Sequence, residues 1–350
     1  MPVSVALLTP FGSPSLRGNA VTVERIARGL GERGVALRVW DVSATPESRA
    51  ADDIDAERPA LIHAFHAWRV GPLALRVARR LEVPLIVTLT GTDANHDLFD
   101  PERAAVVRRV LDGAAAVVVF HASVGDRVVA ALPDVAARLV VIPQAATLQT
   151  EPYDLAARWD LPVDRVLFLF AGGIRPVKRP RFPLAPFARL VERHPRARLA
   201  YAGPVLDRTE GDLLVRELQG IAWARYLGPV PHDQMASLLR AADVVVNCSE
   251  SEGGMANAIL EALAVGRPVL ASDIPGNRSL VEHDVTGLLF SDAGNFLAGA
   301  ERLTSDAALR DRLGRTGRQR VEREYPPKRE IDAYLALYRR FVAVPAGRAC

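Results

Sequence analysis

Short runs of apolar residues alternate with amphipathic stretches along almost the whole chain, and this alternation constrains the fold more than any other feature. Within each run consecutive residues are apolar, as in strands that are buried on both faces of a parallel sheet. Strands are predicted over 3–8, 36–39, 60–65, 84–89, 115–120, 139–142, 165–170, 198–201, 224–227, 243–248, 268–271 and 287–290. Strand, helix and strand repeated in this way predict two doubly wound α/β units in series.

The stretches between the strands carry apolar residues at helical spacing. Helices are predicted over 20–33, 73–81, 182–194, 211–218, 233–241, 256–264, 293–303, 307–324 and 329–341. Pro326-Pro327 interrupts the final run of helices, because proline cannot continue a helix. We therefore expect a Rossmann-like domain over 1–155, joined by a C-terminal helix over 326–345, and a second Rossmann-like domain over 156–325.

Composition excludes several classes of protein. Apolar residues at 49% and charged residues at 24% are typical of globular chains. The 44 basic and 41 acidic residues are interleaved, so no nucleic-acid partner is expected. Two cysteines, Cys248 and Cys350, exclude a disulfide framework and a cysteine-ligated metal site. No apolar run approaches the roughly 20 residues of a membrane helix, and no signal-peptide pattern begins the chain. A cytoplasmic protein is expected; peripheral membrane contact stays open, and nothing indicates the oligomeric state.

The strongest motif follows the predicted strand that ends at Cys248. It reads Ser249-Glu250-Ser251-Glu252-Gly253-Gly254-Met255 and leads into a helix that carries Glu261. Backbone N–H groups at a helix N-terminus attract phosphate, and glycine lets a ligand approach the backbone closely. One acid would then suit a sugar and the other a nucleoside ribose. An acidic capping turn followed by an exposed helical glutamate explains the same residues about as well.

A second motif, Gly172-Gly173-Ile174-Arg175-Pro176-Val177-Lys178, also follows a predicted strand. Lys178 is one of only two lysines among 44 basic residues, which suggests that this position requires a compact ammonium group. Two cations at a strand end would neutralise a diphosphate leaving group. The alternative is a solvated basic loop, and the rarity of lysine favours the functional interpretation.

Polar residues follow strands of the first half as well. The segment 13–19 lacks the G-x-G-x-x-G fingerprint, so a dinucleotide-binding dehydrogenase loses support, although a loop before a helix still suits an anion. His63 is interpreted as a core histidine, whereas His66 lies closer to the expected ligand edge. The segment 90–93 offers hydroxyls and a carboxylate, and an Asx-capped turn explains it equally well. With no cluster of His and Cys residues at metal-ligand spacing, no metal is expected.

Together these motifs resemble those of glycosyltransferase family 4, the group 1 glycosyltransferases, over almost the whole chain. The family likeness lies in Glu252 to Glu261, Arg17-Gly18-Asn19 and the segment 286–290. A subgroup, the glycosyltransferase 1 domain-containing protein 1 sequences, is similar at Gly91-Thr92-Asp93, Gly173-Ile174-Arg175 with Lys178, and Ile274-Pro275-Gly276-Asn277. Bacterial selenosugar synthases share a Thr-Gly-Thr-Asp segment and a Glu-Gly-Gly turn like those here.

The resemblance implies an α/β GT-B fold, in which two doubly wound Rossmann-like domains face each other across a cleft. It implies a hexosyltransferase that moves a sugar, with retention of configuration, from a nucleotide sugar, usually UDP-linked, to an acceptor. The first domain would lie on the acceptor side, and the second would bind the nucleotide sugar. No metal and no cofactor besides the UDP-sugar donor substrate is implied.

The resemblance also assigns roles to individual residues. The expected catalytic residues are Glu252 and His66 at the donor sugar, and Asp93. The donor diphosphate would be held by Arg175, Lys178, Gly253, Gly254 and Met255. The nucleoside would be held by Glu261, Gly228 and Val230. The acceptor and phosphate loop would consist of Arg17, Gly18, Asn19 and Thr92.

Two departures from the family pattern bear on these roles. Eight residues separate Glu252 from Glu261, where the family motif has seven. Either one residue bulges at Gly253-Gly254, which we expect because glycine adopts a bulge at least cost, or Gly253 occupies the acid position. Gly173 stands where the family usually has arginine, and Arg175 is expected to replace it.

Three functions stay open at this point. A glycosyltransferase is favoured over a non-catalytic nucleotide-sugar-binding protein, which the extra residue in the glutamate motif would suit. A sugar-nucleotide epimerase on the same fold is the third. The sequence does not identify the acceptor: a selenophosphate-type anion, a lipid and a small sugar are all compatible with it.

Overall fold

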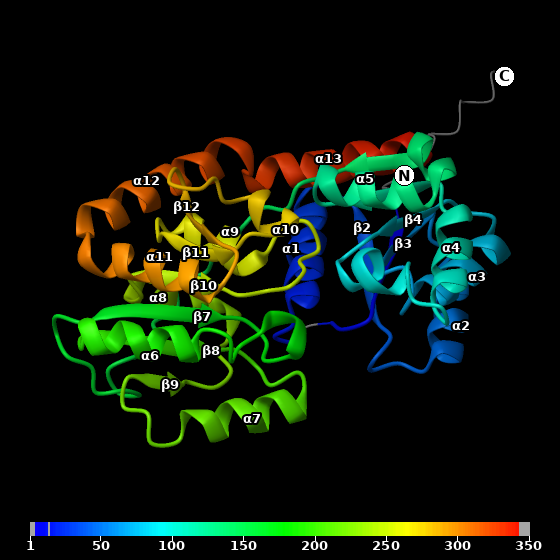
Figure 1. Cartoon of the computed structure of the whole chain (residues 1–350). Helices are drawn as coiled ribbons and strands as arrows, with labels where there is room; N and C mark the ends of the chain where they lie inside the picture. The colour runs from blue at the N-terminus through cyan, green and yellow to red at the C-terminus, as the bar shows by residue number, and fades with distance from the viewer. Residues whose placement is uncertain (1–3, 13–14, 343–350) are drawn as a thin grey trace, which may run out of the picture. The chain divides into compact units, whose positions relative to one another are not determined.

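The structure, a computed structural model, describes residues 4–12 and 15–342 and divides them into two compact units (Figure 1). The first unit contains the described residues up to Gln144 and those from Pro327 onward. The second unit extends from Ala145 to Pro326. The chain thus leaves the first unit at residue 144, where the sequence placed the boundary at 155, and returns to it at 327.

The first unit is built on a six-stranded sheet in the order β2-β1-β3-β4-β5-β6. All five pairings are parallel, so the carboxyl ends of the strands share one edge of the sheet. The strands are β1 (Ser4–Thr9), β2 (Ala36–Asp41), β3 (Leu61–Phe65), β4 (Leu85–Thr88), β5 (Ala116–Val119) and β6 (Leu139–Val141). Position 3 of the first predicted strand lies outside the described residues.

Side chains alternate between the two faces of this sheet, and each face is covered by its own apolar cluster. The helices of the unit are α1 (Gly18–Glu32), α2 (Glu47–Glu57), α3 (Gly71–Leu81), α4 (Ala104–Asp112), α5 (Ala122–Ala131) and α13 (Pro327–Phe341), with the short turns η1 (Asp93–Asp97) and η2 (Pro133–Arg138). Ala6 and Leu8 contribute to the cluster that contains α2, α3 and α4, whereas Val5 and Leu7 contribute to the cluster that contains α1 and α13.

Buried polar groups fasten the last helix, α13, to this unit. The guanidinium of Arg25 on α1 donates two hydrogen bonds of 2.9 Å to the carboxylate of Glu330, and both side chains are buried. A bidentate pair of this kind satisfies both charges where water is excluded. Next to it, Gly29 allows close packing, because a Cβ there would lie 2.6 Å from the side chain of Ile331.

The second unit repeats the design with a sheet in the order β12-β11-β10-β7-β8-β9, again parallel throughout. Its strands are β7 (Val166–Ala171), β8 (Ala197–Ala202), β9 (Ala224–Tyr226), β10 (Val244–Asn247), β11 (Val269–Ser272) and β12 (Gly287–Phe290). Its helices are η3 (Pro176–Lys178), α6 (Leu184–Arg193), α7 (Arg208–Leu218), α8 (His232–Ala241), α9 (Asn257–Ala264), α10 (Pro275–Arg278), α11 (Ala293–Ser305) and α12 (Ala307–Glu324).

The predicted alternation of parallel strands and helices is confirmed in both units. The sequence pattern did not single out α2, α4, α5 and α10. In α2 only Ala50, Ala51 and Ile54 are buried, so its apolar stripe is too narrow to stand out. The helix α10 has a single turn, which is too short for any periodicity.

The core histidine His63 makes the stability of the first unit sensitive to acid. Its ring is fully buried, with Nδ1 2.6 Å from the hydroxyl of Tyr338 on α13 and Nε2 2.7 Å from Thr88 Oγ1. Burial lowers the pKa of His63 from 6.5 to about 3, because the imidazolium cannot be solvated there. The folded state therefore binds this proton less readily than the unfolded state does.

We expect the free energy of unfolding to fall as the pH drops below 6.5, by about 1.4 kcal/mol per pH unit from this residue alone. The measurement is urea unfolding between pH 7.5 and 5 on the wild type, His63→Gln and the control His283→Gln, which alters an exposed histidine. His63→Gln should flatten the pH dependence and His283→Gln should not. Equal slopes in all three proteins would contradict the prediction.

Candidate functional site

A buried carboxylate, that of Glu252, lies at the carboxyl edge of the second sheet. Its side chain is 8% exposed, and one oxygen, Oε1, accepts three hydrogen bonds. The donors are Lys178 Nζ at 2.5 Å, Asn247 Nδ2 at 3.0 Å and Ser249 Oγ at 2.6 Å. Three donors on one oxygen fix the orientation of the carboxylate.

These contacts also determine the charge of Glu252. Burial alone would raise the pKa of the carboxyl group, because it removes water from the charged form. The Lys178 ammonium and the hydrogen bonds from Asn247, Lys178 and Ser249 outweigh burial and hold the pKa below its ordinary value of 4.5. At neutral pH Glu252 is therefore an anion paired with Lys178, which suits it to accept hydrogen bonds and not to donate a proton.

Three separate segments bring these groups together. Lys178 is the last residue of η3, which follows β7, and Asn247 is the last residue of β10. Glu252 and Ser249 belong to the loop after β10, and the backbone N–H of Glu250 donates to the carbonyl of Val177 at 2.9 Å. The two motifs, each of which the sequence placed after a strand, are thus joined at the ends of the neighbouring strands β7 and β10.

A further layer of polar groups supports this loop from behind. Ser272 Oγ at the end of β11 donates to the carbonyl of Ser249 at 2.6 Å. The fully buried amide of Asn277 donates to the carbonyl of Ser272 at 2.9 Å. Asn247 was not singled out from sequence, whereas Ser272 and Asn277 bound a segment that the sequence placed at a strand end. They are ordinary polar residues at strand ends, so only their position on the sheet edge could have identified them.

Two glycines explain how Glu252 is accommodated. Gly254 has φ +106°, a conformation that glycine adopts without strain. Gly276 passes so close that a Cβ there would lie 2.6 Å from Cβ of Glu252. The side chain of Glu252 points into the protein and not to solvent. The bulge at Gly253-Gly254 stays a prediction.

The second predicted glutamate, Glu261, lies on α9 and faces the start of α8. Its Oε1 is 3.0 Å from Nε2 of His232, the first residue of α8, and its side chain is 12% exposed. Sequence reasoning missed His232, which lies 29 residues away along the chain. In the loop before α8, Gly228 has φ +85° and Val230 is buried.

The remaining donor-side predictions occupy the same loops. Arg175 precedes η3 in an extended conformation and is partly buried. Met255 is buried, and Gly253 lies between it and Glu252 in the loop after β10. Gly172, which follows β7, has φ +158°. A Cβ at Gly203, which follows β8, would lie 2.1 Å from the carbonyl oxygen of Gly172, so the backbones at the ends of these two strands are in close contact.

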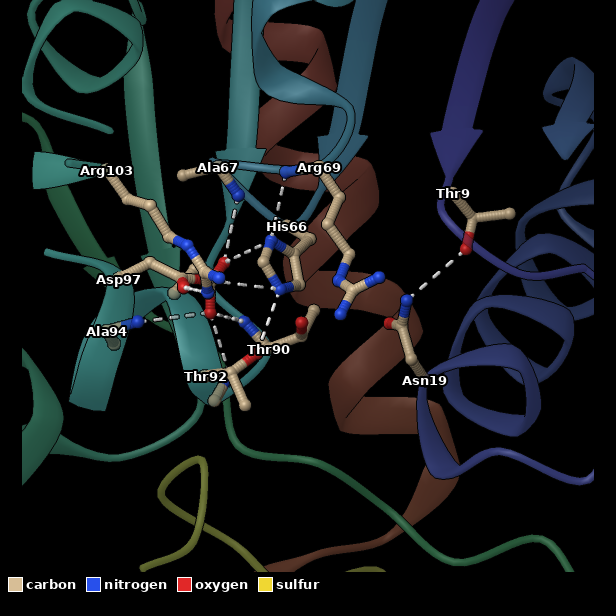
Figure 2. A network of polar contacts seen from close by, with 12 residues as sticks. Thr9, Asn19, His66, Ala67, Arg69, Thr90, Thr92, Ala94, Asp97 and Arg103 are labelled. Atoms are coloured by element: carbon tan, nitrogen blue, oxygen red, sulfur yellow. Dashed lines mark hydrogen bonds and ion pairs between the residues drawn. The ribbon is translucent and has the colours of Figure 1, made fainter. Parts of the chain in front are cut away.

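In the first unit, His66 follows β3 in a strained backbone conformation. Its φ of +106° is rare for a residue with a Cβ and costs on the order of 1–3 kcal/mol. The ring is buried (Figure 2), with Nδ1 accepting from the backbone N–H of Arg69 at 3.3 Å and Nε2 lying 2.9 Å from Thr92 Oγ1. Neutral His66 thus carries its proton on Nε2.

The carboxylate of Asp93 holds the loops around His66 in place. It is fully buried and accepts hydrogen bonds from the backbone N–H groups of Ala67, Thr90, Gly91 and Ala94, at 2.9, 3.0, 2.9 and 3.1 Å. Its Oδ2 is also 3.8 Å from Nδ1 of His66. With both oxygens engaged by backbone, Asp93 is placed to position His66 and Thr92.

Other residues of the first unit, among them the predicted Arg17, Gly18 and Asn19, lie around this network. Asp97 Oδ2 is 3.8 Å from Nε2 of His66, and its Oδ1 accepts from Arg103 at 2.9 Å. Gly18 begins α1, and Asn19 Nδ2 donates to Thr9 Oγ1 at 3.3 Å (Figure 2). Arg17 precedes α1, whereas positions 13 and 14 of the same predicted loop lie outside the described residues.

None of the helices in the described residues combines the length and the apolar character that spanning a membrane requires. Within the same residues, no three His, Cys, Asp or Glu side chains are grouped so that they would hold a metal ion.

Comparison with known proteins identifies the family. The family described as Glycosyl transferases group 1 matches residues 165–306, and the Glycosyl transferase 4-like domain matches residues 3–145. A D-inositol 3-phosphate glycosyltransferase from Frankia alni is 31% identical over 288 residues, which are 74% of this chain and 69% of that protein. The chain belongs to the group 1 glycosyltransferases. It is an enzyme of that class, and the family resemblance drawn from the motifs is confirmed.

The subgroup resemblance of this glycosyltransferase is confirmed as well. Glycosyltransferase 1 domain-containing protein 1 from Xenopus tropicalis is 28% identical over 327 residues, covering 91% of this chain and 93% of that protein. Among solved structures, sucrose-phosphate synthase from Thermosynechococcus elongatus matches with a TM-score of 0.80 at 20% identity over 96% of this chain and 98% of the other. Anabaena Alr3699/HepE in complex with UDP-glucose matches with a TM-score of 0.75 at 15% identity over 95% and 98%. These likenesses confirm the GT-B fold class.

The ion pair between Lys178 and Glu252 predicts a strong coupling in the glycosyltransferase. Lys178→Met leaves a buried carboxylate without its cation, so it should destabilise the protein more than the double variant Lys178→Met/Glu252→Gln does. Because the two residues are in contact, the coupling energy should be about 1–3 kcal/mol. Urea unfolding of the four proteins at pH 7 measures it.

The pH dependence of the unfolding free energies of these four proteins provides an internal control. The lowered pKa of Glu252 contributes stability that is fully present above pH 4.5 and is lost as the pH falls through the folded-state pKa. The stability difference between the wild type and Glu252→Gln should therefore shrink below pH 4.5. Additive effects of the two substitutions, or a difference that is independent of pH, would contradict the ion-pair assignment.

Proposed function

We propose that this glycosyltransferase is a retaining, metal-independent enzyme that transfers a sugar from a UDP-sugar to an acceptor. The observation that carries the proposal is the anionic Glu252 held by Lys178, Asn247 and Ser249 at the carboxyl edge of the second sheet. Ligands of doubly wound sheets bind at this edge. The complex of Anabaena Alr3699/HepE with UDP-glucose, a protein of the same fold, supports the choice of donor.

In this proposal the second unit binds the donor. Lys178 has three N–H donors and uses one of them on Glu252 among the described residues, which leaves two for a phosphate oxygen. Arg175 supplies a further positive charge for the diphosphate. The backbone N–H groups of Gly253, Gly254 and Met255 supply hydrogen-bond donors for it. Glu252, fixed as an anion, accepts hydrogen bonds from hydroxyl groups of the donor sugar.

The nucleoside is assigned to the groups around Glu261. A carboxylate accepts hydrogen bonds from both ribose hydroxyls, and His232 orients it by holding Oε1 at 3.0 Å. The backbone at Gly228 and Val230 contacts the base in this proposal.

The chemical step requires stabilisation of the leaving group more than acid catalysis. The bond between the anomeric carbon and the β-phosphate oxygen breaks, and UDP leaves with the electron pair. The acceptor oxygen bonds to the same face of the anomeric carbon, and its proton passes to the departing phosphate oxygen. Cationic side chains and N–H groups aimed at the diphosphate stabilise the charge that develops there.

The first unit binds the acceptor in this proposal. His66 contacts the donor sugar, and Thr92 with Arg17, Gly18 and Asn19 lies on the acceptor side. Asp93 acts as a positioning residue and not as a catalytic one, because backbone N–H groups already occupy its oxygens.

The function is tested by incubating the protein with a panel of UDP-, ADP- and GDP-sugars and measuring release of the free nucleotide. We expect slow release from a UDP-sugar without acceptor and faster release with a suitable acceptor. Proton NMR of the product would show the configuration at the anomeric carbon. Inversion would exclude the retaining mechanism, an epimerised sugar nucleotide would identify an epimerase, and tight UDP binding without turnover would identify a binding protein.

Glu261→Ala should mainly weaken nucleotide binding. A ribose contact is made in the ground state and the transition state alike, so its loss should raise Kd for UDP and KM for the donor about tenfold with little change in kcat. Calorimetric titration with UDP and initial rates measure both quantities.

Glu252→Ala is the matched comparison for Glu261→Ala. It should lower kcat, because its contact aligns the sugar as the diphosphate leaves, while Kd for UDP changes little. If the two variants show the same pattern, the separate roles of the two glutamates are wrong.

Activity should survive removal of metal ions. The proposed site relies on Lys178, Arg175 and backbone N–H groups for the diphosphate, so turnover in EDTA should stay within about twofold of the untreated enzyme. Loss of activity that Mg²⁺ restores would contradict this prediction. Separate measurement of UDP release would show whether the metal acts on product dissociation alone.

A further inference from the structure

Arginine and aromatic side chains form a stacked series at the carboxyl edge of the first sheet, here called the arginine ladder. Arg17 and Arg69 both stack on the ring of Phe11, at 4.1 and 5.5 Å from its centroid. Arg69 and Arg103 both lie over the ring of Trp68, at 5.8 and 4.4 Å. The two aromatic rings therefore hold three guanidinium groups in one row.

The central member of the ladder, Arg69, forms no ion pair within the described residues. Within the described residues its side chain makes only the two aromatic contacts, and it is exposed. A guanidinium that lies over aromatic rings keeps N–H groups available for a ligand. The ladder thus contains a donor group that no carboxylate of the described residues uses.

The acidic side chains around the ladder are already engaged. Asp97 accepts from Arg103 at 2.9 Å, Asp93 accepts from four backbone N–H groups, and Asp41 accepts from Gly12 N at 2.8 Å and from Ser43. Stacking several like charges on shared rings is unfavourable unless counter-charge is supplied. A bound anion would supply it at Arg69.

Arg69 lies next to residues that the proposed function places at the reaction site. Its backbone N–H donates to Nδ1 of His66, and its side chain extends between His66 and Asn19 (Figure 2). The N-terminus of α1, which begins at Gly18, has no acidic residue in its first turn. The positive end of that helix adds to the same field.

We propose that Arg69 binds an oxyanion, a phosphate or a carboxylate, on the acceptor, so that the acceptor is a small anionic molecule and not a neutral sugar. This inference rests on the proposed transferase function and adds the acceptor class to it. A guanidinium makes two parallel hydrogen bonds to either oxyanion, which fixes orientation as well as position.

The test uses protein saturated with UDP, because the diphosphate site is then filled and an anionic probe cannot enter it. Glucose, glucose 6-phosphate and glucuronate are titrated into this complex by calorimetry, with inorganic phosphate as the probe for the anion alone. The variants are Arg69→Gln, Arg69→Lys and the control Arg49→Gln, an exposed arginine on α2 outside the ladder.

We expect glucose 6-phosphate or glucuronate to bind the wild type at least tenfold more tightly than glucose, and the better of the two identifies the oxyanion. Arg69→Gln should lose at least tenfold of that affinity, and Arg69→Lys should lose less, because it keeps the charge without the planar fork. Arg49→Gln should bind as the wild type does. Equal affinity for glucose, no binding of any probe, or an unchanged Arg69→Gln would overturn the proposal.

The donor function is assessed separately in the same proteins. Affinity for UDP and slow release of UDP from a UDP-sugar should be the same in Arg69→Gln and the wild type. If UDP does not bind at all, the proposed function fails. Titration of inorganic phosphate into the nucleotide-free wild type, Lys178→Ala and Arg69→Gln then still decides whether Arg69 binds an oxyanion.

Discussion

A carboxylate that stays charged while it is buried imposes the strictest requirement on the second unit. Removing the Glu252 anion from water costs several kcal/mol unless cations and donors replace the water. Lys178, Asn247 and Ser249 do so on a single oxygen, and they come from three segments that only the parallel sheet brings to one edge. The rest of the edge follows from this requirement: Ser272 fastens the loop, and residue 276 must be glycine because any Cβ there would collide with Glu252.

The first unit solves the equivalent problem with backbone groups and not with a cation. The carboxylate of Asp93 accepts hydrogen bonds from four backbone N–H groups in the segments before and after it. These bonds hold its loop in place without an arginine or lysine partner. That rigidity allows His66 to keep a φ of +106°, which a flexible loop would relax. The consequence is electrostatic: in the second unit the nearby cation is neutralised by Glu252, whereas in the first unit the guanidinium of Arg69 keeps its charge.

The sequence predicted most of the fold because buried parallel strands leave an unmistakable apolar signal, and every predicted strand corresponds to one in the structure. It predicted the candidate site less completely. Glycine turns, the rare Lys178 and the acidic loop carry a local signal, but the partners that set their chemistry are remote. His232 meets Glu261 across 29 residues, and Asn247 and Ser272 are ordinary strand-end residues until the sheet order places them beside Glu252. Arg69 resembled one of many arginines, because its distinguishing feature is the pair of rings on which it stacks.

The contrast between the two edges explains how one protein can treat two anionic ligands differently. A diphosphate that meets Lys178 must share the ammonium with Glu252, so donor binding depends on several weaker contacts, which Arg175 and the N–H groups of the Gly253-Gly254 loop provide in our proposal. In our proposal an oxyanion meets Arg69, whose guanidinium lies over Phe11 and Trp68 and is not shared with a carboxylate of the described residues. In our proposal one guanidinium therefore selects the acceptor and several shared contacts select the donor, and this difference is the physical basis on which the glycosyltransferase would distinguish its two substrates.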